Sequence, residues 1–104
     1  MAHTGMLMSV QANINGKSVK CVLDTGASHS VMSPKMAQSL GLENNGQMHL
    51  VRLADGSEVE SAMTREFQTV VSNHAAIISF LLIPGSETLI GLDWFEATGA
   101  TFGS

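Results

Sequence analysis

The 104-residue chain is long enough for one small domain with a single core, so residues 1–104 are expected to form one domain. Five basic residues against nine acidic ones give a net charge of -4, and no basic cluster suits a nucleic acid partner. The longest apolar run, residues 75–84, is about half the length of a membrane-spanning helix, which excludes a membrane partner of that kind.

Cysteine and histidine usage argues against a disulfide framework or a metal site. Cys21 is the one cysteine, and the four histidines are scattered along the chain. We therefore expect no cofactor and no metal, and we expect Cys21 to be a buried strand residue, because free cysteine packs as a small hydrophobe. This sequence shows no signal peptide, which predicts a cytoplasmic location.

The first predicted element is a β-hairpin over residues 6–23. Two alternating apolar runs flank Asn15-Gly16, a dipeptide that favours a type I′ turn because both central positions need positive φ. The second strand leads directly into Asp24.

A short helix is expected within residues 30–46. Ser33 can cap it, Pro34 suits its first turn and Gly41 can end it, which predicts a helix of about two turns. Asp55-Gly56, within residues 48–62, then predicts a second hairpin with an exposed, mobile tip.

The rest of the chain carries strand and turn signals that end in a second small helix. The expected elements are strands at 65–72 and 76–83 joined through Asn73-His74, a Pro84-Gly85 turn, an apolar run at 88–90, and one or two helical turns before Gly99. Short strands with one or two small helices predict an all-β domain, closed or sandwich-like. The following residues are expected to pack in its core: Met6, Met8, Met32, Met36, Met48, Trp94 and Phe95.

Asp24 has two interpretations. A carboxylate before Thr25-Gly26 can simply accept backbone hydrogen bonds in an Asx-turn, and the bare tripeptide favours this. However, an apolar strand carries this acid outward, while Gly26 and Ala27 leave room for another backbone beside it. The pattern indicates that something large lies close to Asp24.

Three segments resemble the retropepsin-like aspartic proteases of retroviruses, Ty3/gypsy-type retrotransposons and their domesticated cellular relatives. The catalytic loop of that family is similar to "VLDTGASHSVMS", the flap hairpin to "RLADGSEVES", and the second signature to "LIGLDWF". The first and third segments lie about 65 residues apart, and the resemblance spans nearly the whole chain.

The resemblance implies a small closed β-barrel of the retropepsin type with one or two short helices, active as a homodimer. Each chain would contribute one catalytic Asp24 to an aspartic endopeptidase that hydrolyses extended peptide segments, such as those of a polyprotein. Two carboxylates so close cannot both ionise, and the shared proton makes one a base for water and the other an acid.

The resemblance also assigns supporting roles. Thr25 and Gly26 would support the catalytic loop, and Gly91 would lie behind it, where a side chain cannot fit. Asp93 would begin the last helix, more as a cap than as a second catalytic acid. Substrate would bind to the catalytic loop and the flap tip, namely Gly26, Ala27, Ser28, Ala54, Asp55, Gly56 and Ser57.

Two departures from the viral pattern stand out. Ser28 and Leu92 occupy positions where the viral enzymes carry an acid and an arginine that pair, so an ion pair that helps brace the dimer is missing. His29 can face either the substrate or solvent. The alternative function is a catalytically idle domain of this fold used for dimerisation or peptide binding, and a further alternative is an unrelated small β-barrel with an accidental Asp-Thr-Gly.

Overall fold

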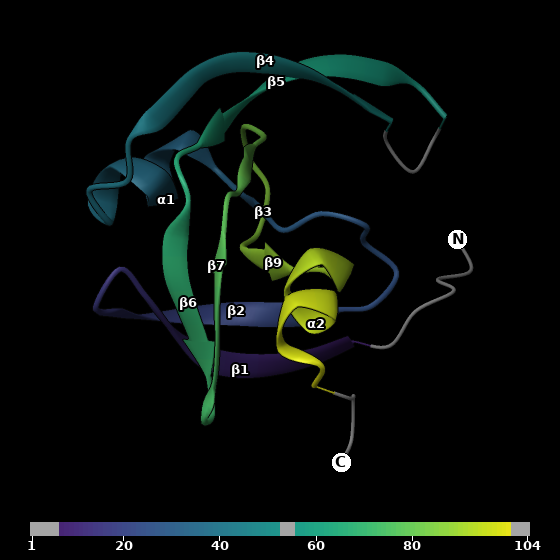
Figure 1. Ribbon diagram of the computed structural model, residues 1–104. Helices are drawn as coiled ribbons and strands as arrows, with labels where there is room; N and C mark the ends of the chain where they lie inside the picture. Colours follow the sequence, from purple (N-terminus) through teal and green to yellow (C-terminus); the bar gives the residue numbers. More distant parts are fainter. Residues whose placement is uncertain (1–6, 53–55, 101–104) are drawn as a thin grey trace.

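The computed structural model describes residues 7–52 and 56–100, which form one curled sheet with two short helices (Figure 1). The strand order is β4-β5-β8-β3-β9-β2-β1-β6-β7. The elements are β1 (Leu7–Ile14), β2 (Lys17–Asp24), β3 (Val31–Met32), α1 (Pro34–Ser39), β4 (Asn44–Arg52), β5 (Glu58–Thr64), β6 (Phe67–Val71), β7 (His74–Ile78), β8 (Leu81–Leu82), β9 (Leu89–Ile90) and α2 (Leu92–Thr98). The predicted mostly-β domain with small helices is confirmed.

The sheet is a half-barrel rather than the closed barrel that the sequence predicted. Its outer strands are β4 and β7, which stand at opposite ends of the strand order. In Figure 1, β4 and β5 arch over the rest of the molecule as an arm. Because most side chains of β4 are exposed, no buried apolar face draws this arm against β7. In the described part of the chain neither helix is long and apolar enough to cross a membrane.

The β1–β2 hairpin has the predicted turn. Asn15 and Gly16 both have positive φ, 54° and 83°, as a type I′ turn requires. The two strands pair along their full length, from Ile14 opposite Lys17 to Leu7 opposite Asp24. This register brings the acid to the open end of the hairpin.

The helix α1 begins and ends where its sequence signals predict. The Ser33 side chain accepts a hydrogen bond from the Met36 amide at 3.1 Å, and Pro34 is the first helical residue. Gly41, just beyond the last turn, has a φ of 71°. The cap and the glycine stop are therefore local features that the sequence alone specifies.

The strand predicted over residues 76–83 is divided in the structure. β7 ends at Ile78, and the chain then crosses to pair with β3 and β5 as β8. The crossing is fixed by Phe80, which is fully buried and whose amide donates to Thr64 Oγ1 at 2.9 Å. The preceding turn is also one residue earlier than predicted, since Ser72 carries the positive φ of 57° and His74 already belongs to β7.

The core joins α2 to the inner face of the sheet. Trp94 is almost fully buried, contacts Phe95 edge-to-face at 5.2 Å between ring centroids, and donates from Nε1 to the Thr69 carbonyl at 3.0 Å. The prediction that both aromatic residues pack on the sheet is confirmed. The largest fully buried side chains include Trp94, Phe80, Ile14, Met32 and Ile90.

The methionines are only partly in the core. Met32 is fully buried and Met36 packs against the core, as predicted. For Met8 and Met48 the prediction is wrong, since they are 43% and 60% exposed. Met6 lies outside the described residues.

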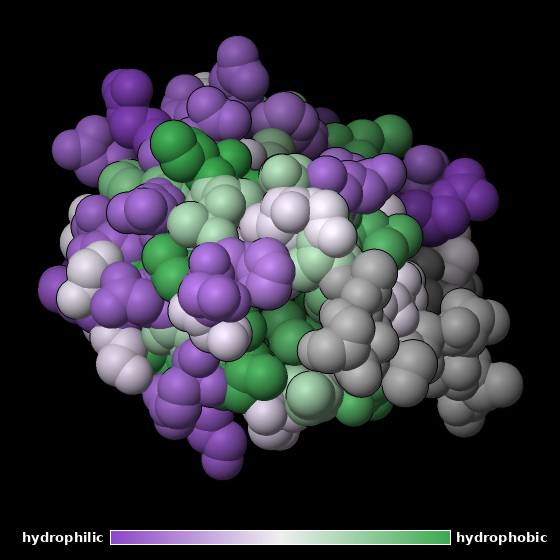
Figure 2. Space-filling view, turned by 60° about the horizontal axis from the view of Figure 1, so that its bottom comes forward, coloured by the Kyte–Doolittle hydropathy of each residue, from purple (hydrophilic) through white to green (hydrophobic). Residues whose placement is uncertain are grey.

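Large exposed apolar side chains lie on several elements of the fold. Figure 2 turns the lower side of Figure 1 forward and shows hydrophobic side chains interspersed with hydrophilic ones on this face. Large exposed hydrophobic residues of the described chain are Leu7, Met8, Met48, Leu50, Val59, Ile77 and Leu92.

We expect the stability of the fold to decrease at alkaline pH through Cys21. Burial raises the pKa of this thiol from 9.0 to about 11, so the folded state favours the protonated form. Its contribution to stability is therefore complete below pH 9 and is lost as the pH rises through about 11. Urea denaturation between pH 8 and about 11 should show this loss.

The variant Cys21→Ala provides the reference, because it keeps every other titratable group and lacks only the thiol. Its free energy of unfolding should fall less over the same pH range than that of the wild type. Equal falls in the two proteins would show that the thiol does not contribute.

Candidate active site

Asp24 is the last residue of β2 and is held at the end of a buried strand. Its neighbour Leu23 pairs with Ile90 of β9, and the Val22 amide donates to the Thr88 carbonyl at 3.0 Å. The residue is only 6% exposed. An acid at this depth has a fixed position, because strands on both sides hold its backbone.

The Asx-turn and a chemical role for Asp24 are compatible. The Gly26 amide donates to Asp24 Oδ1 at 2.9 Å, and the Ala27 amide donates to the Asp24 carbonyl at 3.1 Å. The turn thus orients the carboxyl group, and the carboxyl group can still take part in a reaction. Gly26 is exposed and has no side chain, so this tight turn leaves space beside the acid.

Gly91 lies directly behind residues 24–30, a loop called catalytic for its resemblance to that of the aspartic proteases. A Cβ on Gly91 would lie 2.6 Å from the Ala27 carbonyl oxygen and 2.9 Å from the His29 carbonyl oxygen. The next amide, of Leu92, donates to the same Ala27 oxygen at 2.8 Å. Only a glycine lets the chain approach the loop this closely.

Ser30 and Asp93 form a buried connection between the catalytic loop and α2. Asp93 Oδ2 accepts from the Ser30 amide at 3.0 Å and Oδ1 accepts from the Ser30 hydroxyl at 2.7 Å. Ser30 Oγ in turn accepts from the Gly91 amide at 3.0 Å, and Ser30 is fully buried. Each polar atom of this buried group therefore has a partner, which makes the connection rigid.

The expected role of Asp93 as a helix cap is wrong. The N-cap of α2 is Gly91, and Asp93 lies in the first turn, where its carboxylate bonds Ser30. The importance of Ser30 escaped the sequence analysis. The one feature of the sequence that could have indicated Ser30 is its position as a small polar residue directly before the apolar strand residues Val31 and Met32.

A cavity of about 720 Å³ separates the catalytic loop from the β4–β5 arm, and Asp24 lines it. Of the residues predicted to bind substrate, Gly26, Ala27 and Ser28 line this cavity. Its apolar walls come chiefly from Val31, Val51, Met63, Leu81, Ile83 and Leu89. A largely apolar cleft of this volume with one buried acid suits a peptide ligand.

Three other predicted site residues, all of them described, do not line the cavity. Thr25 is half-buried beside Asp24 and does not line it. Gly56 and Ser57 are exposed and also lie away from its lining. Ala54 and Asp55, the rest of the predicted flap tip, lie outside the described residues.

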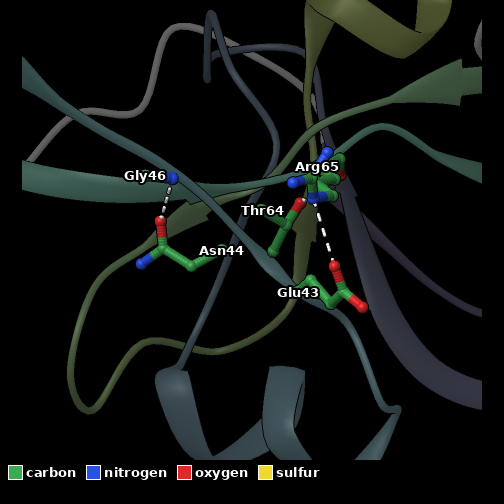
Figure 3. A network of polar contacts seen from close by, with 5 residues as sticks. All are labelled: Glu43, Asn44, Gly46, Thr64 and Arg65. Carbon is green, nitrogen blue, oxygen red and sulfur yellow. Dashed lines mark hydrogen bonds and ion pairs between the residues drawn. The ribbon is translucent and has the colours of Figure 1, made fainter.

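The base of the β4–β5 arm is braced by polar contacts (Figure 3). Arg65 Nε lies 3.1 Å from Glu43 Oε2, and the Arg65 amide donates to the Glu43 carbonyl at 2.7 Å. Asn44 Oδ1 accepts from the Gly46 amide at 2.7 Å, within the bulge where the pairing register shifts between Asn44 and Met48. The arm is thus anchored at its base while most of β4 beyond the bulge is exposed.

Three basic side chains accompany Asp24 on the cavity wall: His29, His49 and Arg52. His29 is exposed, and its Nδ1 lies 3.2 Å from Ser28 Oγ. Arg52 lies 3.8 Å from Glu58, and both side chains are largely exposed. Within the described ranges, no three His, Cys, Asp or Glu residues are grouped as metal ligands would be.

We expect Gly91→Ala to lower the free energy of unfolding by about 3 kcal/mol, because two backbone oxygens must move to admit the methyl group. Gly85→Ala is the matched control. Its Cβ meets nothing within 4 Å and suffers only from the positive φ of 77°, at a cost of about 1 kcal/mol. Urea denaturation of both variants measures the difference, and an equal or smaller loss for Gly91→Ala would contradict the close approach.

Comparison with known proteins agrees with this geometry. The family model of aspartyl proteases matches residues 10–94, a segment that includes both the Asp24 loop and Gly91. No curated protein matches the chain. Since the matched segment covers most of the sequence, the chain belongs to the aspartyl protease family.

Proposed function

We propose that the protein is an aspartic endopeptidase of the retropepsin type that works as a homodimer with Asp24 and its symmetry mate as the catalytic pair. The observation that carries the proposal is the position of Asp24, which is buried at a strand end and opens into the cleft under the β4–β5 arm. The family match supports the protease activity in general terms.

The proposed reaction needs two carboxyl groups that share one proton. The ionised carboxylate removes a proton from water as the oxygen attacks the peptide carbonyl, and the protonated partner donates its proton to the carbonyl oxygen. Collapse of the tetrahedral intermediate breaks the C–N bond as a proton passes to the amide nitrogen. Each cycle consumes one water molecule and returns the pair to its singly protonated state.

The need for a second chain follows from the count of suitable acids. Asp24 is the one acidic residue among the side chains that line the cleft in the described part of the chain. A second carboxylate at the required distance must therefore come from another molecule, and a two-fold axis beside Asp24 would supply an identical one.

Exposed apolar residues near Asp24 support an interface on this edge. Leu7, which pairs with Asp24, is 58% exposed, and Met8 beside it is 43% exposed. Leu92, whose amide bonds the catalytic loop, is 39% exposed and stands where the viral enzymes carry a charge. Covering these side chains would stabilise a dimer.

The substrate class is an extended peptide, because the cleft is bordered by the backbone of the catalytic loop and by a β-strand arm. An extended chain between them can pair with both in the manner of an added strand. The proposal includes the processing of a polyprotein of the retroviral or retrotransposon kind.

The Asp24→Asn variant should lose at least about 10³-fold in kcat/KM on a cleaved peptide, because an amide can neither accept the proton of water nor share one. The fold should survive, since an amide oxygen can still accept from the Gly26 amide. Glu96→Gln, on the exposed side of α2, is the control and should retain activity. Full activity in Asp24→Asn would exclude the proposed chemistry.

Activity should depend on dimer formation. Below the dimer dissociation constant, tenfold dilution should lower the rate per chain by about tenfold. Adding folded Asp24→Asn protein to a fixed amount of wild type should inhibit it, because mixed dimers lack one carboxylate. A rate per chain that is constant on dilution and insensitive to the variant would refute the shared pair.

A further inference from the structure

Two histidines from different elements line the same cleft. His29 belongs to the catalytic loop and His49 to β4, and both line the cavity that contains Asp24. Together with Met63 they also line a second cavity of about 760 Å³. Residues that line both cavities lie on the boundary between them, so the two histidines mark that boundary.

The His49 ring holds a polar atom without a partner. Its Nε2 is enclosed, and no hydrogen bond to it is formed within the described structure. Such an atom costs free energy until it finds a partner. Because χ2 of histidine is broad, a small rotation of the half-buried ring can present this nitrogen to the cleft, where a ligand oxygen could satisfy it.

The charges around the pair favour a negatively charged ligand. Along the described wall of the first cavity, the ionisable groups are Asp24, His29, His49 and Arg52, so the catalytic residue is the one acid. Arg52 is near Glu58, but at 3.8 Å and high exposure this contact is weak.

The second cavity adds three charged residues on the other side of the histidines: Arg65, Glu66 and Asp93. Asp93 is engaged by Ser30 and the Trp94 amide, and Arg65 is paired with Glu43. Glu66 is exposed. Thus no described acidic group is bonded to either histidine.

We propose that His29 and His49 form a subsite for an acidic side chain of the peptide substrate, so that the protease prefers Asp or Glu at one position away from the scissile bond. This inference rests on the proposed function. Imidazole donates to a carboxylate through its N–H group, and the bond strengthens when the ring is charged. Among the described residues of the cleft wall, the two histidines and Arg52 are the groups that can attract a carboxylate.

The test compares peptides that differ in a single side chain. Each position of a cleaved peptide is replaced in turn by Glu or by Gln, and kcat/KM is measured for each peptide. At one position the Glu peptide should be cleaved about tenfold faster than the Gln peptide. Taking the ratio of the two rates cancels the contribution of the catalytic pair, which both peptides use.

Variants test whether the imidazole rings of the two histidines cause the preference for Glu. In His29→Gln and in His49→Gln the Glu/Gln ratio of kcat/KM should fall toward one. His74→Gln is the matched control, because His74 is an exposed histidine on β7 that lines neither cavity. It should keep the wild-type ratio.

A second measurement separates this proposal from the proposed protease activity. Binding of the same Glu and Gln peptides to Asp24→Asn protein, followed by fluorescence anisotropy, requires no cleavage. Tighter binding of the Glu peptide, lost in Asp24→Asn/His49→Gln, supports the subsite even if the wild type cleaves nothing. Equal binding and equal cleavage of the two peptides at every position would overturn it.

Discussion

The close approach of Gly91 to the catalytic loop is the contact on which the site depends. Two carbonyl oxygens of the loop lie where a Cβ would be, and the adjacent Leu92 amide bonds one of them. Asp93, two residues further on, holds Ser30 at the other end of the loop. One short segment therefore positions the loop by contact, by a backbone hydrogen bond and by a buried carboxylate.

This arrangement explains why two segments about 65 residues apart act as a unit. Asp24 emerges from β2 and Gly91 follows β9, and these strands pair in parallel at Leu23 and Ile90. Parallel neighbours bring the residues that follow them to the same edge of the sheet. The site thus lies where the two strands end, and α2 is fixed behind it by Trp94 in the core.

Features set by local chemistry were predictable from the sequence. The Asn15-Gly16 turn, the Ser33 cap and the glycine stops depend on a few consecutive residues, and the structure has them as expected. The division of 76–83 into β7 and β8 was not predictable, because it depends on where Phe80 is buried and on its contact with Thr64. The exposure of Met48 likewise depends on which face of β4 meets the core.

The residues of the site also include some that the sequence could predict and some that it could not. The resemblance to the retropepsin-like proteases identifies Asp24 and Gly91, but it does not show which residues of the arm face the cleft. His49 lines the cleft because β4 pairs with β5 over it, and this pairing, whose register shifts between Asn44 and Met48, is a tertiary property. Ser30 was missed for a related reason, since its partner Asp93 lies 63 residues away.

In the proposed dimer, the steps that one chain can perform alone follow from the residues that line its cleft. Among its described residues each protomer has a cleft wall, an arm held at its base and two histidines, yet one carboxylate that lines the cleft. In the proposed dimer the binding groups would act within a single chain, whereas the chemistry would need both chains. Such a protomer could recognise a peptide before it can cut one, and association would then turn binding into hydrolysis. The exposed Leu7, Met8 and Leu92 lie near the acid, so the surface that would drive pairing and the residue that would require it occupy the same edge of the fold.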